Sequence, residues 1–194
     1  RLPMEMHIEA MYEFAGELFI GTFSDGVYVV ERSTGQIRSL DAFVPHVPIR
    51  TFAKTHDNTL LIGADGAGVF QMDRNAEKLL HHYMTDEDDE RSLNGNTVSD
   101  ICVDEHNGIW ISTSTNGISY LDLNMPDIRR TKHERHNINS LKSDHINVIF
   151  QDSEGDCWYG TNNGISLYQS KQNRWTHFLD DAGHSGKVVL ALAE

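Results

Sequence analysis

Short turns that recur along the chain carry the side chains best suited to bind a ligand. Each turn ends at a glycine and offers amide, hydroxyl or carboxylate groups, which can hydrogen-bond the hydroxyls of a sugar. The same residue types also form tight turns for purely structural reasons, because Asp and Asn side chains hydrogen-bond their own backbone. Both interpretations apply to the candidate ligand-binding set, which is Phe23, Asp25, Asp65, Asn116, Asn162 and Asn163.

Two groups of side chains have the chemistry of metal ligands but not the spacing. Residues 86–90 read Asp-Glu-Asp-Asp-Glu, and calcium prefers carboxylate oxygens. This run lacks the spaced ligands and central glycine of a calcium loop, which favours a solvated acidic loop. His133 and His136 lie near His145, but no Cys-x-x-Cys or His-Glu-x-x-His motif accompanies them. The sequence therefore predicts no metal site and no cofactor.

The chain has no recognisable catalytic constellation. Its segment from Gln151 to Trp158 is similar to the S-x-D-x-G-x-x-W turn of sialidase-type propellers in Gly155 and Trp158. Gln151 and Ser153, however, stand where that turn has Ser and Asp. There is no evident arginine trio, nucleophile elbow or phosphate-binding loop, so we expect no catalytic residue and no enzymatic activity. Trp110 and Trp158 are interpreted as packing aromatics of a strand, with sugar stacking as the alternative.

The elements that position these turns form a repeat. An apolar run that ends in a small residue occurs at residues 18–21, 60–63, 109–112 and 157–160, so the period lies in the forties. Each run follows an extended segment and a polar turn, and it precedes the glycine-containing turn and another apolar segment. Such a period with several strands per unit is typical of a β-propeller. Four matched units make four unrelated hairpins the weaker alternative.

We predict an all-β fold, a single partial β-propeller over residues 1–194 with about four four-stranded blades. The apolar runs are apolar on both faces, so each sheet should be covered on both sides. The last strand of the third blade is weak, near residues 128–132. The final segment has the pattern of an orphan fifth inner strand, which predicts a piece of a larger propeller. The expected blades are residues 4–40, 47–83, 96–132 and 144–178, and a fifth starts at 187–194.

Composition limits the partners of the chain. It has 194 residues, 39% of them hydrophobic, and a formal net charge of -13. This negative charge disfavours binding to nucleic acid, to anionic membrane surfaces and to heavily sulfated glycans. No apolar run is long enough to span a membrane, so any membrane attachment is expected outside this segment. Cys102 and Cys157 fall on strands of different blades, so we expect buried free thiols and no disulfide.

Two of the four units resemble the two-component regulator propeller repeat. The first two units depart from it, since both lack its tryptophan and Ala64 replaces its threonine. The resemblance therefore depends chiefly on residues 92–168. The matching residues are Ser92, Leu93, Asn94, Gly95, Asn96, Val98, Ile101, Asp104, Gly108, Trp110, Ile111 and Gly117, and then Ser140, Leu141, Ile146, Ile149, Asp152, Gly155, Trp158, Gly160, Thr161, Gly164 and Tyr168.

The resemblance implies paired seven-bladed propellers in the periplasmic sensor half of hybrid histidine kinases, often from gut Bacteroidetes. Such propellers detect oligosaccharides and signal across the inner membrane. We accordingly predict a non-catalytic, periplasmic segment that senses an oligosaccharide or another small ligand, within a homodimeric parent protein. The alternative is a structural propeller that dimerises through residues such as Trp175 and Phe178. A carbohydrate-active propeller enzyme is the third hypothesis.

Overall fold

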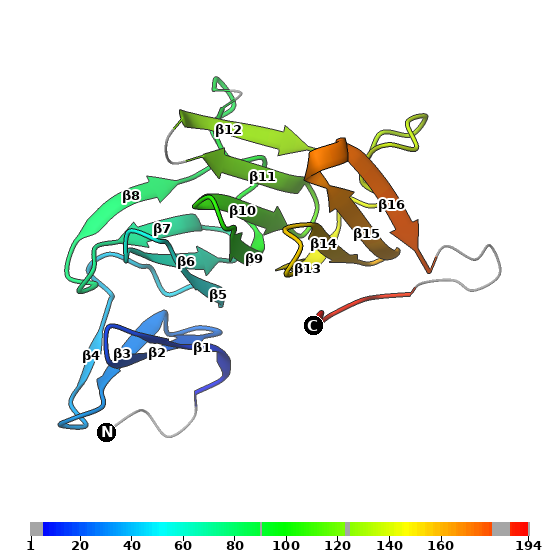
Figure 1. The fold of residues 1–194 in the computed structure, drawn as a ribbon. Helices are drawn as coiled ribbons and strands as arrows, with labels where there is room; N and C mark the ends of the chain where they lie inside the picture. The colour runs from blue at the N-terminus through cyan, green and yellow to red at the C-terminus, as the bar shows by residue number, and fades with distance from the viewer. Residues whose placement is uncertain (1–5, 90, 123–124, 180–186, 194) are drawn as a thin grey trace. The chain divides into compact units, whose positions relative to one another are not determined.

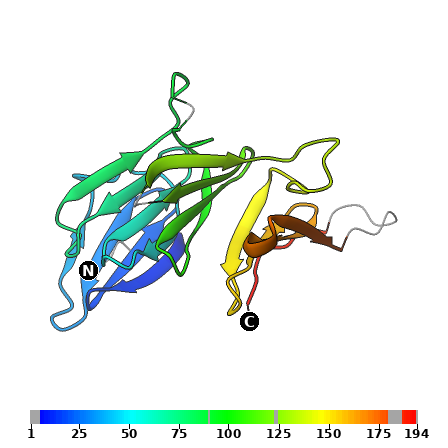
Figure 2. The ribbon, with the colours of Figure 1, turned by 45° about the horizontal axis from the view of Figure 1, so that its top comes forward.

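The structure is a computed structural model that describes residues 6–89, 91–122, 125–179 and 187–193. Within these residues the chain forms four antiparallel four-stranded sheets and one 3-10 turn, Ser170–Gln172 (Figure 1; Figure 2). In every sheet the strands lie side by side in sequence order, so hairpins join all neighbours. The predicted all-β fold with propeller blades is confirmed.

The strands of each sheet follow one another closely in sequence. The first sheet contains β1 (Ile8–Phe14), β2 (Glu17–Thr22), β3 (Val27–Glu31) and β4 (Ile37–Ser39). The second contains β5 (Ile49–Lys54), β6 (Leu60–Ala64), β7 (Gly68–Met72) and β8 (Leu79–Tyr83). The third contains β9 (Val98–Val103), β10 (Gly108–Thr113), β11 (Gly117–Asp122) and β12 (Met125–Thr131). The fourth contains β13 (Ile146–Gln151), β14 (Cys157–Thr161), β15 (Gly164–Gln169) and β16 (Arg174–Phe178).

The residues group into two compact units. One unit, here the N-terminal unit, spans residues 1–84 with 96–98 and holds the first two sheets. The other, the C-terminal unit, spans residues 85–95 with 99–194 and holds the last two, apart from the first residue of β9. In the third sheet the last strand starts at Met125, earlier than the sequence pattern indicates, and pairs along β11.

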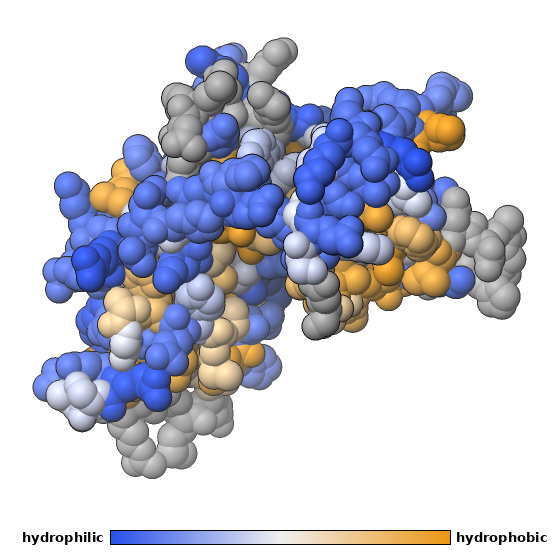
Figure 3. All heavy atoms as spheres, viewed as in Figure 1, coloured by the Kyte–Doolittle hydropathy of each residue, from blue (hydrophilic) through white to orange (hydrophobic). Residues whose placement is uncertain are grey.

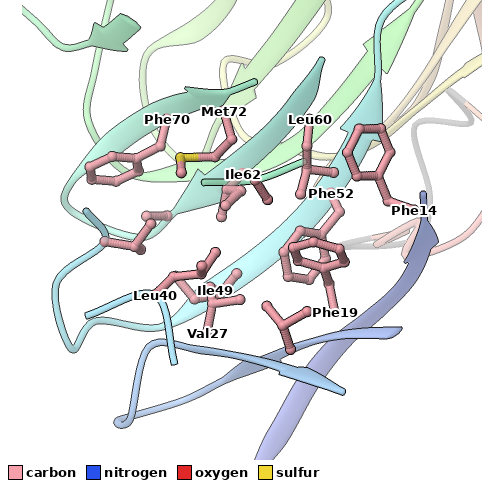
Figure 4. Packing of buried hydrophobic residues seen from close by; sticks show 14 of the residues in the cluster. Phe14, Phe19, Val27, Leu40, Ile49, Phe52, Leu60, Ile62, Phe70 and Met72 are labelled. Carbon is pink, nitrogen blue, oxygen red and sulfur yellow. The ribbon is translucent and has the colours of Figure 1, made fainter. Parts of the chain in front are cut away.

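The core of the N-terminal unit lies between its two sheets. The Phe19 ring of β2 packs edge-on against Phe14, with ring centres 5.9 Å apart, and against Phe52 of β5, at 6.2 Å. Figure 4 shows these rings pointing into a cluster of aliphatic side chains from β5, β6 and β7. Leu61 and Ile62 point to opposite faces of β6, and both are fully buried. The second sheet is therefore covered on both faces, as the apolar run predicts.

At Gly21 and Gly160, two of the small residues that end the apolar runs, the following segment of the chain approaches the sheet closely. A Cβ atom on Gly21 would lie 2.7 Å from Ile49 Cγ2, closer than real Cβ contacts. A Cβ on Gly160 would lie 2.8 Å from Val189 of the segment that follows, and 2.6 Å from Val148 of its own sheet. These glycines let the inner strand of the following segment seat directly on the sheet.

Residues 187–193 lie against the fourth sheet in the manner of an inner strand. Gly164 donates a backbone hydrogen bond to Lys187 O at 2.8 Å, as Gly117 does to Asp144 O at 3.0 Å in front of β13. Val189 N then donates to Thr161 O at 3.0 Å. These residues form no assigned strand. A further blade at 187–194 stays a prediction, and its last residue lies outside the described part.

The fourth sheet presents an apolar face toward residues 187–193. Phe150, Trp158 and Ile165 line a cavity of about 290 Å³ there, together with Leu192 and Ala193. Phe178 stacks on Trp158 with ring centres 5.5 Å apart, and 40% of it remains exposed. Figure 3 shows hydrophobic side chains gathered over this part of the C-terminal unit. The face thus has the composition of a surface that packs against another sheet.

Replacing Gly21 with alanine tests the close approach of the first two sheets. Gly21→Ala should lower the free energy of unfolding by about 1–3 kcal/mol, because Ile49 must move away from the new methyl group. Gly95→Ala is the matched control, since the nearest atom to its Cβ would be Asn116 Cγ at 3.2 Å, a longer distance than that at Gly21. Urea unfolding measures both variants, and equal losses would contradict this account of Gly21.

Candidate functional site

The turn between the first two strands of each sheet in the C-terminal unit is built on a buried or half-buried aspartate. Asp104 Oδ1 accepts hydrogen bonds from the backbone of Gly108 at 2.7 Å and His106 at 2.9 Å. Its other carboxylate oxygen accepts one from the Trp110 indole at 3.0 Å. The aspartate therefore fixes both the turn and the rotamer of the strand tryptophan.

The fourth sheet repeats this arrangement. Asp152 Oδ1 accepts from the backbone of Asp156 and Glu154, and Oδ2 accepts from Trp158 Nε1 at 2.7 Å. Both tryptophans are thus strand-packing residues, as the sequence predicts, and their indole N–H groups are occupied. Sequence reasoning missed the Asp–Trp pairing, although the same separation of six residues in both units is a usable signal.

The connections that lead into β9 and β13 each fold around a Ser-Leu pair, Ser92-Leu93 and Ser140-Leu141, here called the Ser-Leu motif. Ser92 Oγ accepts from Asp86 N at 2.8 Å, and Ser140 Oγ accepts from Glu134 N at 3.0 Å. The leucines that follow, Leu93 and Leu141, are fully buried. In each motif the serine therefore closes its own loop by hydrogen bonding, and the leucine anchors the loop in the core.

In the N-terminal unit, the turn between β2 and β3 carries two of the predicted ligand-binding residues, Phe23 and Asp25. Phe23 is 48% exposed, although it is a large aromatic side chain. Asp25 lies beside it and accepts a hydrogen bond from the exposed Ser24 hydroxyl at 2.9 Å. His46, which lies outside the turn, packs beside Gly26 of the turn. Its Nε2 lies 3.2 Å from Asp41 Oδ1. An aromatic face, a carboxylate and an imidazole therefore gather at this turn.

Asp65, the other predicted residue of this unit, is held in an ion pair. Its Oδ2 accepts from Arg50 Nη2 at 2.7 Å, and Arg50 Nη1 reaches Glu9 at 2.8 Å. These side chains are about one-third exposed. Hydrogen bonding to Asp65 raises the pKa of Arg50 against the opposing effect of its partial burial. The Asp65 carboxylate is therefore engaged in joining β5 to the turn after β6.

The predicted residues of the C-terminal unit differ in how far they are engaged. Asn116 Nδ2 donates to Asn94 O at 2.7 Å and its Oδ1 accepts from Thr115, so both ends of the amide are used. Asn162 Oδ1 accepts from Asn147 at 2.9 Å, while the side chain stays exposed. Asn163 is exposed, and only its backbone N–H forms an observed hydrogen bond. Asn163 is therefore the most available of the three.

Two arginine side chains, Arg91 and Arg130, contact the acidic loop. Arg130 donates to Ser92 O at 3.0 Å and to Asp89 O at 3.3 Å. The backbone N–H and guanidinium of Arg91 lower the pKa of Asp89. Glu90 lies outside the described residues. In the part of the chain that the structure describes, no three His, Cys, Asp or Glu side chains are grouped so that they could hold a metal ion.

Both cysteines are free thiols in the core between the two sheets of the C-terminal unit. Cys157 is buried, and Cys102 packs against the same cluster although it comes from another sheet. Burial is the main cause that raises the pKa of Cys102 to about 11 and that of Cys157 to about 12. Both therefore stay protonated and poorly nucleophilic at neutral pH.

Two segments, residues 92–115 and 140–163, match the family model described as two component regulator propeller. They coincide with the Ser-Leu loops and Asp–Trp turns described above. No curated protein sequence matches the chain closely enough to count as a relative. Within the described residues, no helix has the length and apolar character needed to span a membrane.

Several solved propeller structures are similar to the chain. An extracellular domain assigned to a hybrid two component system of B. thetaiotaomicron has a TM-score of 0.68 and 17% identity, over 89% of this chain and 24% of that one. PorZ, a surface component of the type-IX secretion system of Porphyromonas gingivalis, has 0.67 and 12%, over 91% and 28%. Virginiamycin B lyase from Staphylococcus aureus has 0.69 and 13%, over 92% and 57%. At these identities the likeness shows the fold alone.

The Asp152 turn gives a pH-dependent prediction. Burial tends to raise the pKa of Asp152, but hydrogen bonds from Trp158 and the turn backbone outweigh it, so the pKa lies below the usual 3.8. A lowered folded-state pKa stabilises the protein above the usual pKa, and that contribution is lost as the pH falls through the lowered value. In urea unfolding below about pH 4, Asp152→Asn should therefore lose less stability with acidification than the wild type. Parallel pH profiles would contradict this role.

Proposed function

We propose that this chain, which carries two-component regulator propeller repeats, is a ligand-sensing segment of an extracytoplasmic two-component sensor. The observation that carries the proposal is the family match at residues 92–115 and 140–163. The extracellular domain from B. thetaiotaomicron supports it through its fold. Because the chain spans about a quarter of that domain, the activity and partners of the whole protein belong to the proposal.

The proposed ligand is an oligosaccharide, bound at the exposed turns. A sugar presents hydroxyls that need hydrogen-bond partners and apolar C–H faces that stack on aromatic rings. Phe23 and Asp25 offer both chemistries in the N-terminal unit. In the C-terminal unit, Asn163 offers an exposed amide. We also propose a periplasmic location, because a similar structure is an extracellular domain. We propose no catalytic role, because the aspartates of the Asp104 and Asp152 turns bind the tryptophan indoles and the turn backbone.

Alanine variants of the exposed turns test the proposed site in the intact protein. Phe23→Ala and Asp25→Ala should each weaken binding to an oligosaccharide identified on a glycan array by about tenfold, the loss of one good contact. Asp88→Ala, at an exposed aspartate of the acidic loop, is the matched control and should bind normally. Isothermal titration gives the affinities, and melting temperatures show whether the variants fold. Unchanged affinity in both turn variants would remove this turn from the site.

A protein-interaction role is the second candidate, favoured by the apolar face of the fourth sheet. In this hypothesis a second copy covers the part of that face that residues 187–193 leave exposed, including Phe178, and the parent protein dimerises through it. Phe178→Asp should then shift the intact protein from dimer to monomer in light scattering, because a charge would be buried in the contact. Ile138→Asp, at a 91% exposed position, is the control. A dimer that survives Phe178→Asp argues against this face.

A further inference from the structure

A polar hollow lies in the N-terminal unit at the opposite strand ends from the Phe23 turn. Its volume is about 500 Å³, and its lining includes Glu13, Gly16, Lys54, Asn58, Arg74 and Asn75. These residues come from the β1–β2, β5–β6 and β7–β8 turns and from the ends of β1 and β5, so three turns of two sheets meet here. The volume falls within the range of small-molecule sites.

The hollow is locally cationic in an acidic chain. Glu13 is paired with Arg32 at 2.8 Å, so its charge is compensated. Among the described residues, Lys54 and Arg74 have no carboxylate partner. Two uncompensated cations facing one hollow stand out against a net charge of -13. Together with the Asn58 and Asn75 amides, they form a set of donors for an anionic, hydrogen-bonding ligand.

The turn that carries Arg74 is fixed before any ligand arrives. Asp73 Oδ1 accepts from the backbone of Glu77 at 2.7 Å and Lys78 at 3.0 Å, closing the turn on itself. Arg38 of the first sheet donates to Asn75 O and Ala76 O, both at 3.4 Å, and ties this turn to its neighbour. Fixed turns reduce the conformational entropy that binding would cost.

A second hollow, of about 380 Å³, adjoins the first and shares Gly16 and Asn75 with it. Its lining includes Glu17, Glu31 and Glu77, against the single cation Arg38, which is paired with Glu17 at 2.7 Å. Carboxylates here repel further negative charge but accept hydrogen bonds from hydroxyls. The pair of hollows therefore suits a ligand with one anionic end and a neutral, hydroxyl-rich remainder.

We infer that the hollow between Lys54 and Arg74 binds a saccharide through a single sugar carboxylate. The two cations receive the carboxylate, the asparagine amides bind adjacent hydroxyls, and the acidic hollow admits the neutral remainder. This site is additional to the Phe23 turn and rests on the proposed sensing function. It narrows the ligand class to sugars that carry a carboxylate, such as uronic acids.

The test compares D-galacturonic acid with D-galactose by titration into the intact protein. These probes differ only in the C6 group, so the carboxylate is the variable. Galacturonic acid should bind at least about tenfold more tightly than galactose. Arg74→Gln and Lys54→Gln should each weaken galacturonic acid binding about tenfold, which corresponds to the loss of one charge-assisted contact. Lys78→Gln, which makes the same charge change in the same turn but outside the hollow, should have no effect.

Either of two results would overturn the inference: equal affinity for both sugars, including no binding of either, or galacturonic acid binding that survives both charge-removing variants. Phe23→Ala should leave galacturonic acid binding unchanged, because it lies at the other strand ends. The two proposals can thus fail separately. Loss of array binding in the Phe23 variant, with no effect of either Arg74→Gln or Lys54→Gln on galacturonic acid binding, would support the turn site and rule out the hollow.

Discussion

A sheet that is apolar on both faces must be covered on both faces, and the rest of this structure depends on that requirement. In β6 the side chains on either face are fully excluded from water, which no solitary sheet could achieve. Close stacking requires a small residue where the inner strand of the next segment arrives, hence Gly21 and Gly160. The same requirement explains why residues 187–193 lie across the fourth sheet and why the face beneath them is rich in aromatic side chains.

Stacking leaves the turns as the places where polar chemistry can vary, yet most polar groups in the turns are already engaged. Asp104 and Asp152 hold tryptophan indoles and turn backbones, and Ser92 and Ser140 close the long loops. A buried polar group without a partner would be costly, so these side chains serve the fold first. Among the described residues, accessible side chains lie where a turn projects into solvent, as Phe23 and Asn163 do.

The two ends of the strands in the N-terminal unit differ in chemistry. At one end, an exposed aromatic ring and a carboxylate offer stacking and neutral hydrogen bonding. At the other, Lys54 and Arg74 create local positive charge within an acidic chain. A bound ligand interacts mainly with charges close to it, because salt screens its interactions with charges more than about 10 Å away. A net charge that opposes polyanions is therefore compatible with a site for one carboxylate.

The sequence by itself determined the repeat, the strands and the all-β fold, because alternation, apolar runs and turn glycines such as Gly117 are local properties. It also placed the tryptophans in strands. Only the tertiary structure decided which polar turn residues are available: Arg50 engages Asp65 from another strand, and Asn94 engages Asn116 across a loop. It also brought Cys102 and Cys157 into one core and Lys54 and Arg74 to one hollow. Such partners come from separate strands, loops or sheets, so no local motif encodes them, and only the packing of the sheets brings them together.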